Sequence, residues 1–421
     1  MPSSSLALRA RVIFPVDAPP VENGALTVTE GRIAWIGPAD RAEGELIDLG
    51  DVALLPGMVN AHTHLEFSDR QKPLGKPGLP FVEWIRATLA ERGRRKRSPA
   101  KAIRSGYQQS LTSGVTTVGE IVTANAPAYC TRDNSPRLTA FQEVIGFSRA
   151  RADSALTAAI ASLHELGHPQ EDQPNDLQLG VSPHAPYTVS QPLLKGLVDL
   201  AGQRHSPVTM HVAESVAELQ LLTNGTGPFR ELLEERSMWD SEVLTSGSHP
   251  LDYLRLLAQA PRALVVHGNY LCDEAFCFLA DHREHMSLIH CPRTHAFFEH
   301  SPLELSDLLD QGVHLALGTD SRASNPDLCI LREMQHVARH HPKIRPDDIL
   351  KMGTLASAEA LGRATQVGSL TVGKQADLVT IPTGKINDGS PQALLEEVLN
   401  SGQPVKQVWL AGALVQSPHP S

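Results

Sequence analysis

Cysteine is scarce in this sequence and is not arranged for redox or metal chemistry. The chain has five cysteines among 421 residues, and no two of them form a Cys-x-x-Cys pair. A small, odd number of cysteines suits a reducing compartment and speaks against a disulfide-stapled secreted fold. Because residues 1–8 lack a basic stretch followed by an apolar one, we expect no secretory signal and a cytoplasmic location.

Long apolar runs and an excess of positive charge are missing as well. No segment of the chain reaches the ~18 uninterrupted apolar residues that a membrane-spanning helix needs. The formal net charge is −10 at pH 7, and the one dense basic run, 92–97, is interpreted as a solvated helix end. These features predict neither a membrane nor a nucleic-acid partner, and they leave a small molecule as the expected ligand.

Both ends of the chain carry the pattern of short β-strands. Apolar and polar residues alternate between turn residues over the first fifty positions, and the same texture returns near residues 368–381 and 405–412. A chain of 421 residues is also too long for one compact core of ordinary size. We therefore predict a composite β-sandwich formed by residues 1–54 and 366–421, with residues 55–365 inserted as a second domain.

The middle of the chain alternates short apolar runs with amphipathic stretches, as parallel βα units do. Eight candidate strands can be marked, at 53–59, 116–121, 138–145, 177–181, 208–212, 263–267, 286–290 and 313–317. Helical stretches fall between them, at 81–97, 99–113, 150–165, 191–203, 274–281 and 306–311. Eight such units predict a (β/α)8 TIM barrel of the α/β class, whose chemistry lies at the carboxyl ends of the strands.

Polar residues follow the apolar runs immediately at four of these strand ends. The first strand ends in His62 and His64, the fifth in His211 and Glu214, the sixth in His267 and the eighth in Asp320. Three imidazoles and a carboxylate form a competent ligand set for zinc and leave room for water. A single histidine at a strand end is more often a hydrogen-bonded core or surface residue than a ligand. Four such sites are harder to dismiss, since each unused buried polar group costs about 1–3 kcal/mol.

The order of these motifs resembles the amidohydrolase superfamily over almost the whole chain. The matching segments are 56–64, 182–187, 211–214, 267–269 and 317–320, with 368–379 similar to the returning terminal segment. The resemblance implies one divalent cation, zinc first and iron(II) as the alternative, held by His62, His64, His211 and Asp320. It also implies that His267 orients a water molecule, that Glu214 transfers protons, and that Asp320 doubles as a proton acceptor.

The number of metal ions can be argued within that superfamily. Binuclear members place a carboxylated lysine at the end of the fourth strand, where this chain has Pro183 and His184. One ion, as in the adenosine and cytosine deaminase-like branch, therefore fits better. Glu143 ends the third strand and is left open as a ligand or a substrate contact.

Five side chains near the strand ends are predicted to contact the substrate, namely His184, Glu143, Trp84, Arg293 and His295. For His184 the alternative is a helix cap or a packing residue, and for Trp84 packing within a helix is at least as good an interpretation. Cys291, next to Arg293, is interpreted as a packed small residue because no base pairs with it in the sequence pattern.

Further stretches are similar to the aminodeoxyfutalosine deaminase group, namely 64–68, 81–84, 143–146, 291–295 and 319–325. The resemblance implies hydrolytic removal of the 6-amino group from an adenine nucleoside, with 6-amino-6-deoxyfutalosine of a menaquinone pathway as first candidate and ammonia as a product. Deaminases of S-adenosylhomocysteine, methylthioadenosine or other nucleobases, chlorotriazine hydrolases and a metal-free scaffold relative stay as alternatives. Arg322 departs from the small or apolar residue expected beside Asp320, and a homodimer is left open.

Overall fold

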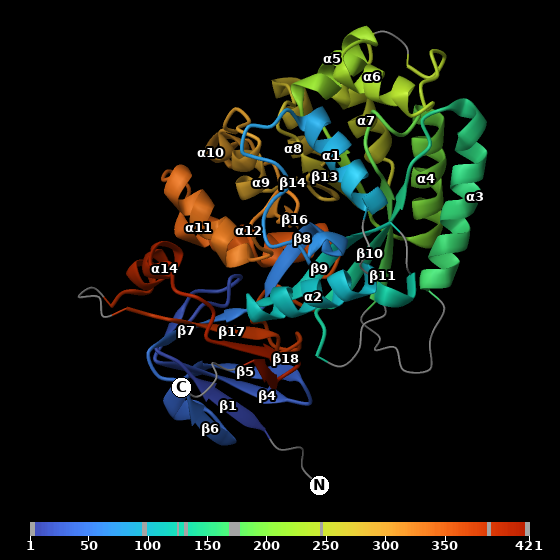
Figure 1. Ribbon diagram of the computed structural model, residues 1–421. Coiled ribbons are helices and arrows are strands. Elements are labelled where there is room, and N and C mark those ends of the chain that lie inside the picture. Colours follow the sequence, from blue (N-terminus) through green and yellow to red (C-terminus); the bar gives the residue numbers. More distant parts are fainter. Residues whose placement is uncertain are drawn as a thin grey trace.

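The computed structural model describes residues 5–94, 99–123, 126–129, 134–167, 177–244, 247–384 and 389–416. Figure 1 shows two parts, a large barrel wrapped in helices and a small β-rich part below it. The first and last strands, β1 (Leu6–Arg9) and β19 (Ala413–Gln416), both belong to the small part. The two ends of the chain therefore build it together, and the barrel is inserted between them.

The barrel consists of parallel strands that follow one another around the ring in chain order. They are β8 (Met58–His64), β9 (Val115–Val122), β10 (Arg137–Val144), β11 (Leu177–Pro183), β12 (Val208–Val212), β13 (Ala263–His267), β14 (Met286–His290), β15 (Leu315–Leu317) and β16 (Asp320–Ser321). β15 and β16 are two pieces of the eighth strand: β15 pairs with β14, and β16 pairs with β8. This pairing closes the ring, and the predicted (β/α)8 barrel is confirmed.

Helices cover the outside of the barrel and extend above it (Figure 1). They are α1 (Phe81–Arg94), α2 (Pro99–Thr112), α3 (Arg149–Leu166), α4 (Gln191–Arg204), α5 (Val216–Asn224), α6 (Pro228–Glu235), α7 (Pro250–Leu257), α8 (Asp273–Asp281), α9 (Pro292–Phe297), α10 (Leu305–Asp310), α11 (Ile330–His340), α12 (Pro346–Met352) and α13 (Leu355–Ala360). The predicted helices are present with end shifts of a few residues, whereas α5, α6, α7, α9, α11, α12 and α13 are additional. Residues 95–98 of the basic run, and Cys130, lie outside the described residues. Within the described ranges, no helix combines the length and the apolar character needed to cross a bilayer.

The small domain contains two sheets. One has the order β5-β4-β1-β6 and the other β19-β18-β17-β7-β2-β3. The remaining strands are β2 (Val12–Ile13), β3 (Val21–Glu22), β4 (Gly24–Thr29), β5 (Arg32–Pro38), β6 (Glu45–Asp48), β7 (Val52–Pro56), β17 (Leu378–Pro382) and β18 (Gln407–Leu410). Side chains from both sheets share one buried core, among them Leu8, Leu26, Leu54 and Trp409. The predicted pairing of the two chain ends into a sandwich is confirmed.

The predicted first strand, 53–59, is wrong because it joins two strands of different domains. β7 pairs with β17 and β2 in the small domain, whereas β8 opens the barrel. Between them, Gly57 passes so close to β9 that a Cβ atom would lie 2.1 Å from Thr116 Oγ1. The apolar character is continuous across this junction, and so the hydrophobic pattern alone conceals it.

The C-terminal segment also departs from an all-β description. α14 (Pro391–Asn400) packs against α11 and α12 on the side of the barrel. A buried ion pair adds a second link between the domains, since Arg137 Nε of β10 lies 2.7 Å from Asp377 Oδ2 beside β17. These contacts hold the small domain at the end of the barrel opposite to the predicted metal ligands.

Candidate active site

Left-handed backbone conformations occur at or beside the carboxyl ends of β12, β13 and β15. Ala213 has φ 53°, His267 has φ 70° and Asp320 has φ 55°. This region is costly for residues other than glycine, by about 1–3 kcal/mol, and it persists where the surrounding structure imposes it. At these positions the unusual backbone turns the chain at the strand ends that carry the predicted site residues.

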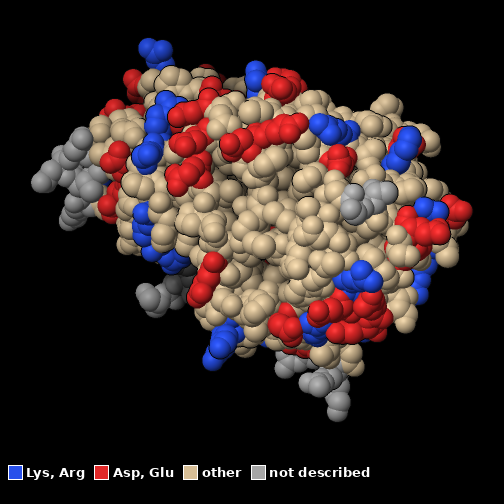
Figure 2. All heavy atoms as spheres, turned by 90° about the horizontal axis from the view of Figure 1, so that it is seen from above, with Lys and Arg blue, Asp and Glu red and all other residues tan. Residues whose placement is uncertain are grey.

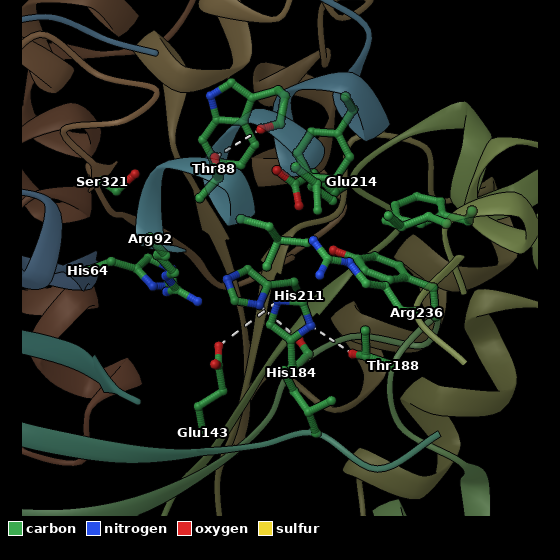
Figure 3. A pocket seen from close by; sticks show the side chains of 18 of the residues that line it. His64, Thr88, Arg92, Glu143, His184, Thr188, His211, Glu214, Arg236 and Ser321 are labelled. Atoms are coloured by element: carbon green, nitrogen blue, oxygen red, sulfur yellow. Dashed lines mark hydrogen bonds and ion pairs between the residues drawn. The ribbon is translucent and has the colours of Figure 1, made fainter. Parts of the chain in front are cut away.

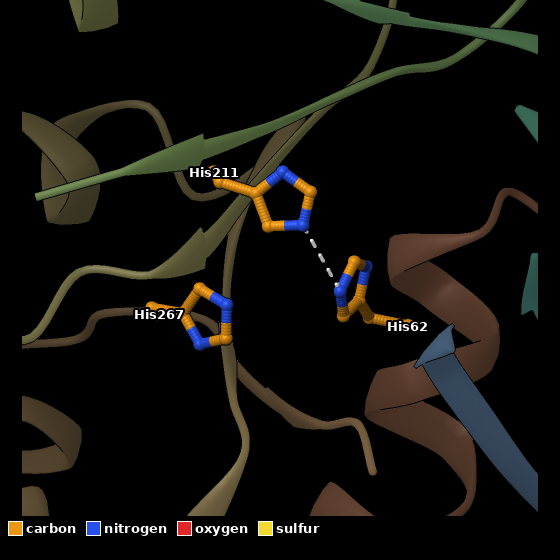
Figure 4. Close-up of side chains that lie close together, drawn as sticks. All are labelled: His62, His211 and His267. Atoms are coloured by element: carbon orange, nitrogen blue, oxygen red, sulfur yellow. Dashed lines mark hydrogen bonds between the residues drawn. The ribbon is translucent and has the colours of Figure 1, made fainter. Parts of the chain in front are cut away.

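The predicted ligands lie in two overlapping groups at the barrel mouth that share His62, one with His64 and Asp320 and the other with His211 and His267. The Nε2 atoms of His62 and His211 lie 3.3 Å apart. Asp320 Oδ1 lies 3.8 Å from His62 Nε2 and 3.6 Å from His64 Nε2. His267 joins the cluster from the other side, with its ring facing those of His62 and His211 (Figure 4).

Hydrogen bonding fixes the direction in which His211 offers its lone pair. His211 Nδ1 lies 2.8 Å from the carbonyl oxygen of His184, which can only accept, so Nδ1 carries the proton. Nε2 is then unprotonated and faces His62 Nε2. Two nitrogens on one tetrahedral zinc ion, each about 2.0–2.1 Å from it, are separated by about 3.3–3.4 Å. The observed separation of 3.3 Å therefore fits a shared cation.

Burial favours the form of these histidines that binds a metal. Desolvation lowers the pKa values of His64, His211 and His267 well below their usual value, and neighbouring imidazoles lower them further. A neutral imidazole is the ligand form, so burial and coordination act in the same direction. The donor set of nitrogens and one carboxylate oxygen is typical of zinc or iron(II).

Second partners hold the ligands in place. Asn60 Oδ1 accepts from the backbone N–H groups of His62 at 3.3 Å and Thr319 at 3.1 Å, and so ties the first strand to the eighth. Ser324 Oγ donates to Asp320 Oδ2 over 2.6 Å. One carboxylate oxygen of Asp320 is thus engaged by the protein, and the other faces the histidines.

Glu214 lies beside the cluster, with Oε1 3.4 Å from His267 Nε2. Burial raises the pKa of the Glu214 carboxyl well above its usual value, and the carboxylates of Asp320 and Glu218 raise it further. Glu218 in turn accepts from the backbone N–H groups of Ala213 at 2.8 Å and Glu214 at 3.0 Å. The turn that presents Glu214 is therefore braced by a buried side chain of α5.

His184 and Glu143 form a second pair on the cavity wall, with His184 Nε2 4.0 Å from Glu143 Oε1 (Figure 3). Thr188 Oγ1 donates its proton to the Ala185 carbonyl oxygen and so accepts a hydrogen bond from His184 Nδ1–H at 2.7 Å. Burial lowers the pKa of His184 to about 4 and raises that of Glu143 to about 7. At neutral pH His184 is uncharged, and its Nε2 is an acceptor facing Glu143.

A cavity of roughly 200 Å³ opens above these groups. In Figure 2 the face above the barrel is hollowed near its middle, and the hollow is mostly uncharged. Its floor is formed by strand-end residues, namely His64, Glu143, His184, His211, Glu214, His267, Asp320 and Ser321. Its walls come largely from α1, the loop after β11 and α6, and they include Phe81, Trp84, Tyr187, Phe229 and Leu233.

Two of the predicted substrate contacts lie outside this cavity. Arg293 donates to Glu333 at 2.6 Å and to Asp327 at 3.0 Å, so its charge is compensated within the protein. His295 uses both ring nitrogens, with Asn269 Oδ1 at 2.9 Å and the carbonyl oxygen of Ser301 at 2.8 Å. The prediction that Arg293 and His295 contact the substrate is therefore not supported, because the polar atoms of both side chains form hydrogen bonds to other segments of the protein.

The other predicted contacts line the cavity. Trp84 does so while packing on Phe81 and donating its indole N–H to the Ala323 carbonyl at 3.2 Å, so it packs within the structure and also faces the cavity. Arg322, which departs from the expected pattern, donates to Gln109 on α2 at 2.6 Å and leaves Ser321 to face the cavity. Burial raises the pKa of the Cys291 thiol, as expected for a packed residue rather than a nucleophile.

Reasoning from the sequence missed both arginines that line the cavity, Arg92 and Arg236. Arg92 lies in the basic run interpreted as a solvated helix end. Its guanidinium forms an ion pair with Glu66 and lies 5.2 Å from the ring centre of Phe67. Arg236 follows α6, a helix that was not predicted.

A barrel with three or four imidazoles and an aspartate at its strand ends, beside a protonatable glutamate, is the architecture of a metal-dependent hydrolase. The profile of the amidohydrolase family matches residues 53–415. The chain belongs to this family, which confirms the resemblance drawn from its motifs.

Two relatives and one solved structure are similar to this chain over most of its length. The chain is 28% identical to an aminodeoxyfutalosine deaminase of Nitratiruptor sp., over 85% of this chain and 86% of the relative. It is 26% identical to a 5-methylthioadenosine/S-adenosylhomocysteine deaminase of Syntrophobacter fumaroxidans, over 85% and 80%. Its fold matches the crystal structure of Helicobacter pylori aminofutalosine deaminase in complex with methylthio-coformycin, with a TM-score of 0.83, 24% identity, and coverage of 97% and 100%.

Proposed function

We propose that this protein is a metal-dependent hydrolytic deaminase of an adenine nucleoside, with 6-amino-6-deoxyfutalosine as the first candidate. The observation that carries the proposal is a protonatable carboxyl, Glu214, beside converging imidazoles at the bottom of an aromatic cavity. Relatives named as deaminases of aminodeoxyfutalosine and of methylthioadenosine support the same chemistry. Deaminases of methylthioadenosine or S-adenosylhomocysteine remain the second candidate.

His62, His64, His211 and Asp320 would hold one divalent cation, zinc first and iron(II) as the alternative. When bound, such a cation lowers the pKa of a coordinated water to about 7 and so supplies a nucleophile near neutral pH. His267 lies across the cluster from His64 and is assigned to orient the attacking water. Its neutral, buried ring can accept a hydrogen bond from that water.

Glu214 is the proposed proton donor. Burial raises its pKa well above the usual value and so favours the protonated carboxyl, which is the form that can give a proton to a ring nitrogen of the base. Protonation of that nitrogen makes the adjacent amino-bearing carbon more electrophilic. Asp320, with one oxygen fixed by Ser324, is assigned to accept the proton of the attacking water. A proton then passes to the amino group, which leaves as ammonia.

The cavity walls suit a flat, weakly polar base. Phe81 and Trp84 stack with ring centres 5.8 Å apart, and Tyr187 and Phe229 with centres 3.9 Å apart. Aromatic faces hold a base by stacking, worth about 1–3 kcal/mol. Glu143 and His184, between these walls and the cluster, are assigned to the polar groups of the substrate. A role in menaquinone synthesis and a cytoplasmic location follow from the first candidate substrate and belong to the proposal.

Ammonia release from a panel of substrates tests this function. Wild-type protein loaded with zinc is expected to deaminate 6-amino-6-deoxyfutalosine with a higher kcat/KM than methylthioadenosine, S-adenosylhomocysteine, adenosine, cytosine or guanine, and to leave a chlorotriazine intact. Glu214→Gln should keep its metal and lose turnover on the order of 10²–10⁴-fold. Absence of ammonia from every adenine nucleoside would contradict the proposed reaction. Normal turnover by Glu214→Gln would instead remove Glu214 from its assigned role.

A further inference from the structure

Arg236 is a cation at the wall of the cavity. It follows the last residue of α6, lines the cavity and is exposed to solvent. Among the described residues, no hydrogen bond or ion pair engages its guanidinium. An arginine in such a position is available to a ligand.

The acidic side chains next to Arg236 are occupied by other arginines. Glu235 accepts two hydrogen bonds from Arg86 of α1, at 2.7 and 3.1 Å. Glu234 accepts from Arg230 at 3.0 Å, and the Arg230 guanidinium also lies 4.8 Å from the ring centre of Trp239. Glu234 and Glu235 are thus both hydrogen-bonded to other arginines. The hydrogen bond from Arg86 lowers the pKa of the Glu235 carboxyl, and Arg236 adds to this effect only through its charge.

Arg92, the other arginine of the cavity, differs in this respect. It is paired with Glu66, and it affects the catalytic end, because it lowers the pKa values of Glu143 and His184. Both arginines are exposed, so the difference between them lies in pairing. Arg92 has a carboxylate partner in Glu66, whereas Arg236 has no ion-pair partner among the described residues.

The part of the cavity wall that surrounds Arg236 is apolar. The residues that flank Arg236 along α6 and after it, Leu232, Leu233 and Met238, are apolar and line the same wall. A nucleoside whose base reaches Glu214 must send its opposite end along this wall toward the mouth. An anionic group at that end would meet Arg236, whose planar guanidinium can donate two parallel hydrogen bonds to a carboxylate.

We propose that Arg236 determines substrate specificity by binding a carboxylate at the end of the nucleoside opposite to its base. The inference rests on the proposed function and deepens it. It separates adenine nucleosides with an anionic substituent from those, such as methylthioadenosine, that carry no charge there. Arg236 touches the substrate but not the reacting atoms, so its effect falls on binding and on kcat/KM rather than on kcat.

The test compares two ligands that differ only in charge, 6-amino-6-deoxyfutalosine and its carboxamide analogue. The readout is the ratio of kcat/KM for the carboxylate to kcat/KM for the carboxamide. Arg236→Met is expected to lower this ratio about tenfold, through KM for the carboxylate, and Arg236→Lys should restore part of it. Arg204→Met removes the same charge from an exposed position at the end of α4, outside the cavity lining, and should leave the ratio unchanged. An unchanged ratio in Arg236→Met would overturn the proposal.

A binding measurement separates this inference from the proposed reaction. Calorimetric titration of Glu214→Gln with 6-amino-6-deoxyfutalosine should give a Kd about tenfold lower than titration of the Glu214→Gln/Arg236→Met double variant. If wild-type protein releases no ammonia yet this difference in Kd is seen, the reaction is wrong and the carboxylate site stands. If ammonia is released and neither Kd nor the ratio responds to Arg236→Met, the carboxylate site is wrong and the reaction stands.

Discussion

The floor and the roof of the cavity are built on different principles. The floor consists of the strand-end residues that line the cavity, namely His64, Glu143, His184, His211, Glu214, His267, Asp320 and Ser321. The roof consists of the side chains that α1 and α6 turn toward the cavity, with Phe81, Trp84 and Arg236 among them. Floor side chains are held by the barrel backbone, and three of them follow or occupy left-handed positions. Roof side chains are held mainly by contacts between α1 and α6. One of these contacts joins Phe81 and Phe229, whose ring centres lie 6.2 Å apart.

This difference assigns chemistry to the floor and selection to the roof. Buried imidazoles and carboxyls with shifted pKa values can move protons and bind a cation, whereas an aromatic wall supplies affinity without reactivity. Changes in the floor should therefore act on kcat, and changes in the roof on KM.

The largest effect is expected from a ligand of the floor. His211→Ala removes an imidazole and the nitrogen that faces His62, so both the metal and activity should be lost, with kcat/KM falling on the order of 10³-fold or more. Steady-state ammonia release and metal content measure this. His205→Asn changes an exposed histidine at the end of α4 and serves as the control. Retention of metal and of turnover by His211→Ala would break the distinction between floor and roof.

A smaller effect is expected from Glu218, which supports the turn that carries Glu214. Glu218→Gln preserves the size of the side chain but replaces one of the two oxygens that accept from Ala213 and Glu214. The turn carrying Glu214 should loosen, and kcat should fall about 10–100-fold with little change in KM. Glu231→Gln on α6 is the exposed control. If KM rises while kcat is kept, Glu218 serves the roof rather than the floor.

The roof is tested by Trp84→Ala, which removes an aromatic face of the cavity. KM should rise about tenfold while kcat changes little, because stacking on a base contributes binding energy only. Trp84→Phe keeps a ring on the wall and should recover most of the loss. A drop in kcat with unchanged KM would show that the roof takes part in the chemical step.

The smallest effect is a dependence of stability on pH through Glu143. Its pKa is about 7 in the folded chain and 4.5 in a model peptide, so the folded state retains a proton that the unfolded state has lost. The stabilising contribution is therefore complete below pH 4.5 and disappears as the pH rises through 7.

Thermal unfolding of metal-free protein at pH 5 and pH 8 measures this contribution. Between the two values, Tm of wild type should fall by about 1–3 °C more than Tm of Glu143→Gln. Glu242→Gln, an exposed glutamate, should follow wild type. Parallel Tm curves for wild type and Glu143→Gln would mean that Glu143 is ionised throughout.

The floor could be predicted from sequence because its residues come directly after apolar runs. A strand that ends in His-x-His or in His-Gly fixes both the position and the direction of its side chains, since alternate residues of a strand share a face. The closed barrel then brings the four strand ends together without further information. For the same reason the predicted bounds of β12, β13 and β14 agree with the structure.

The roof could not be predicted in the same way. Arg92 and Arg236 lie at helix ends among other charged residues, and nothing local distinguishes a cation facing a cavity from one facing solvent. A signal for α5 was present, however, because Ser215 and Glu218 have the spacing of a capping box before an apolar run. In the structure Ser215 Oγ caps the helix at 3.4 Å from Glu218 N, but the Glu218 carboxylate turns back to Ala213 and Glu214. The sequence also carries no sign that Arg293 and His295 lie outside the cavity. Their polar atoms form hydrogen bonds to residues distant in sequence, among them Glu333 and Asn269.

The metal content of the purified protein tests the central claim most directly. If His62, His64, His211 and Asp320 share one cation, elemental analysis should find about one divalent metal ion per chain. Removal of that ion by a chelator should abolish ammonia release until zinc or iron(II) is restored. Full deaminase activity in protein that contains no metal would contradict the account.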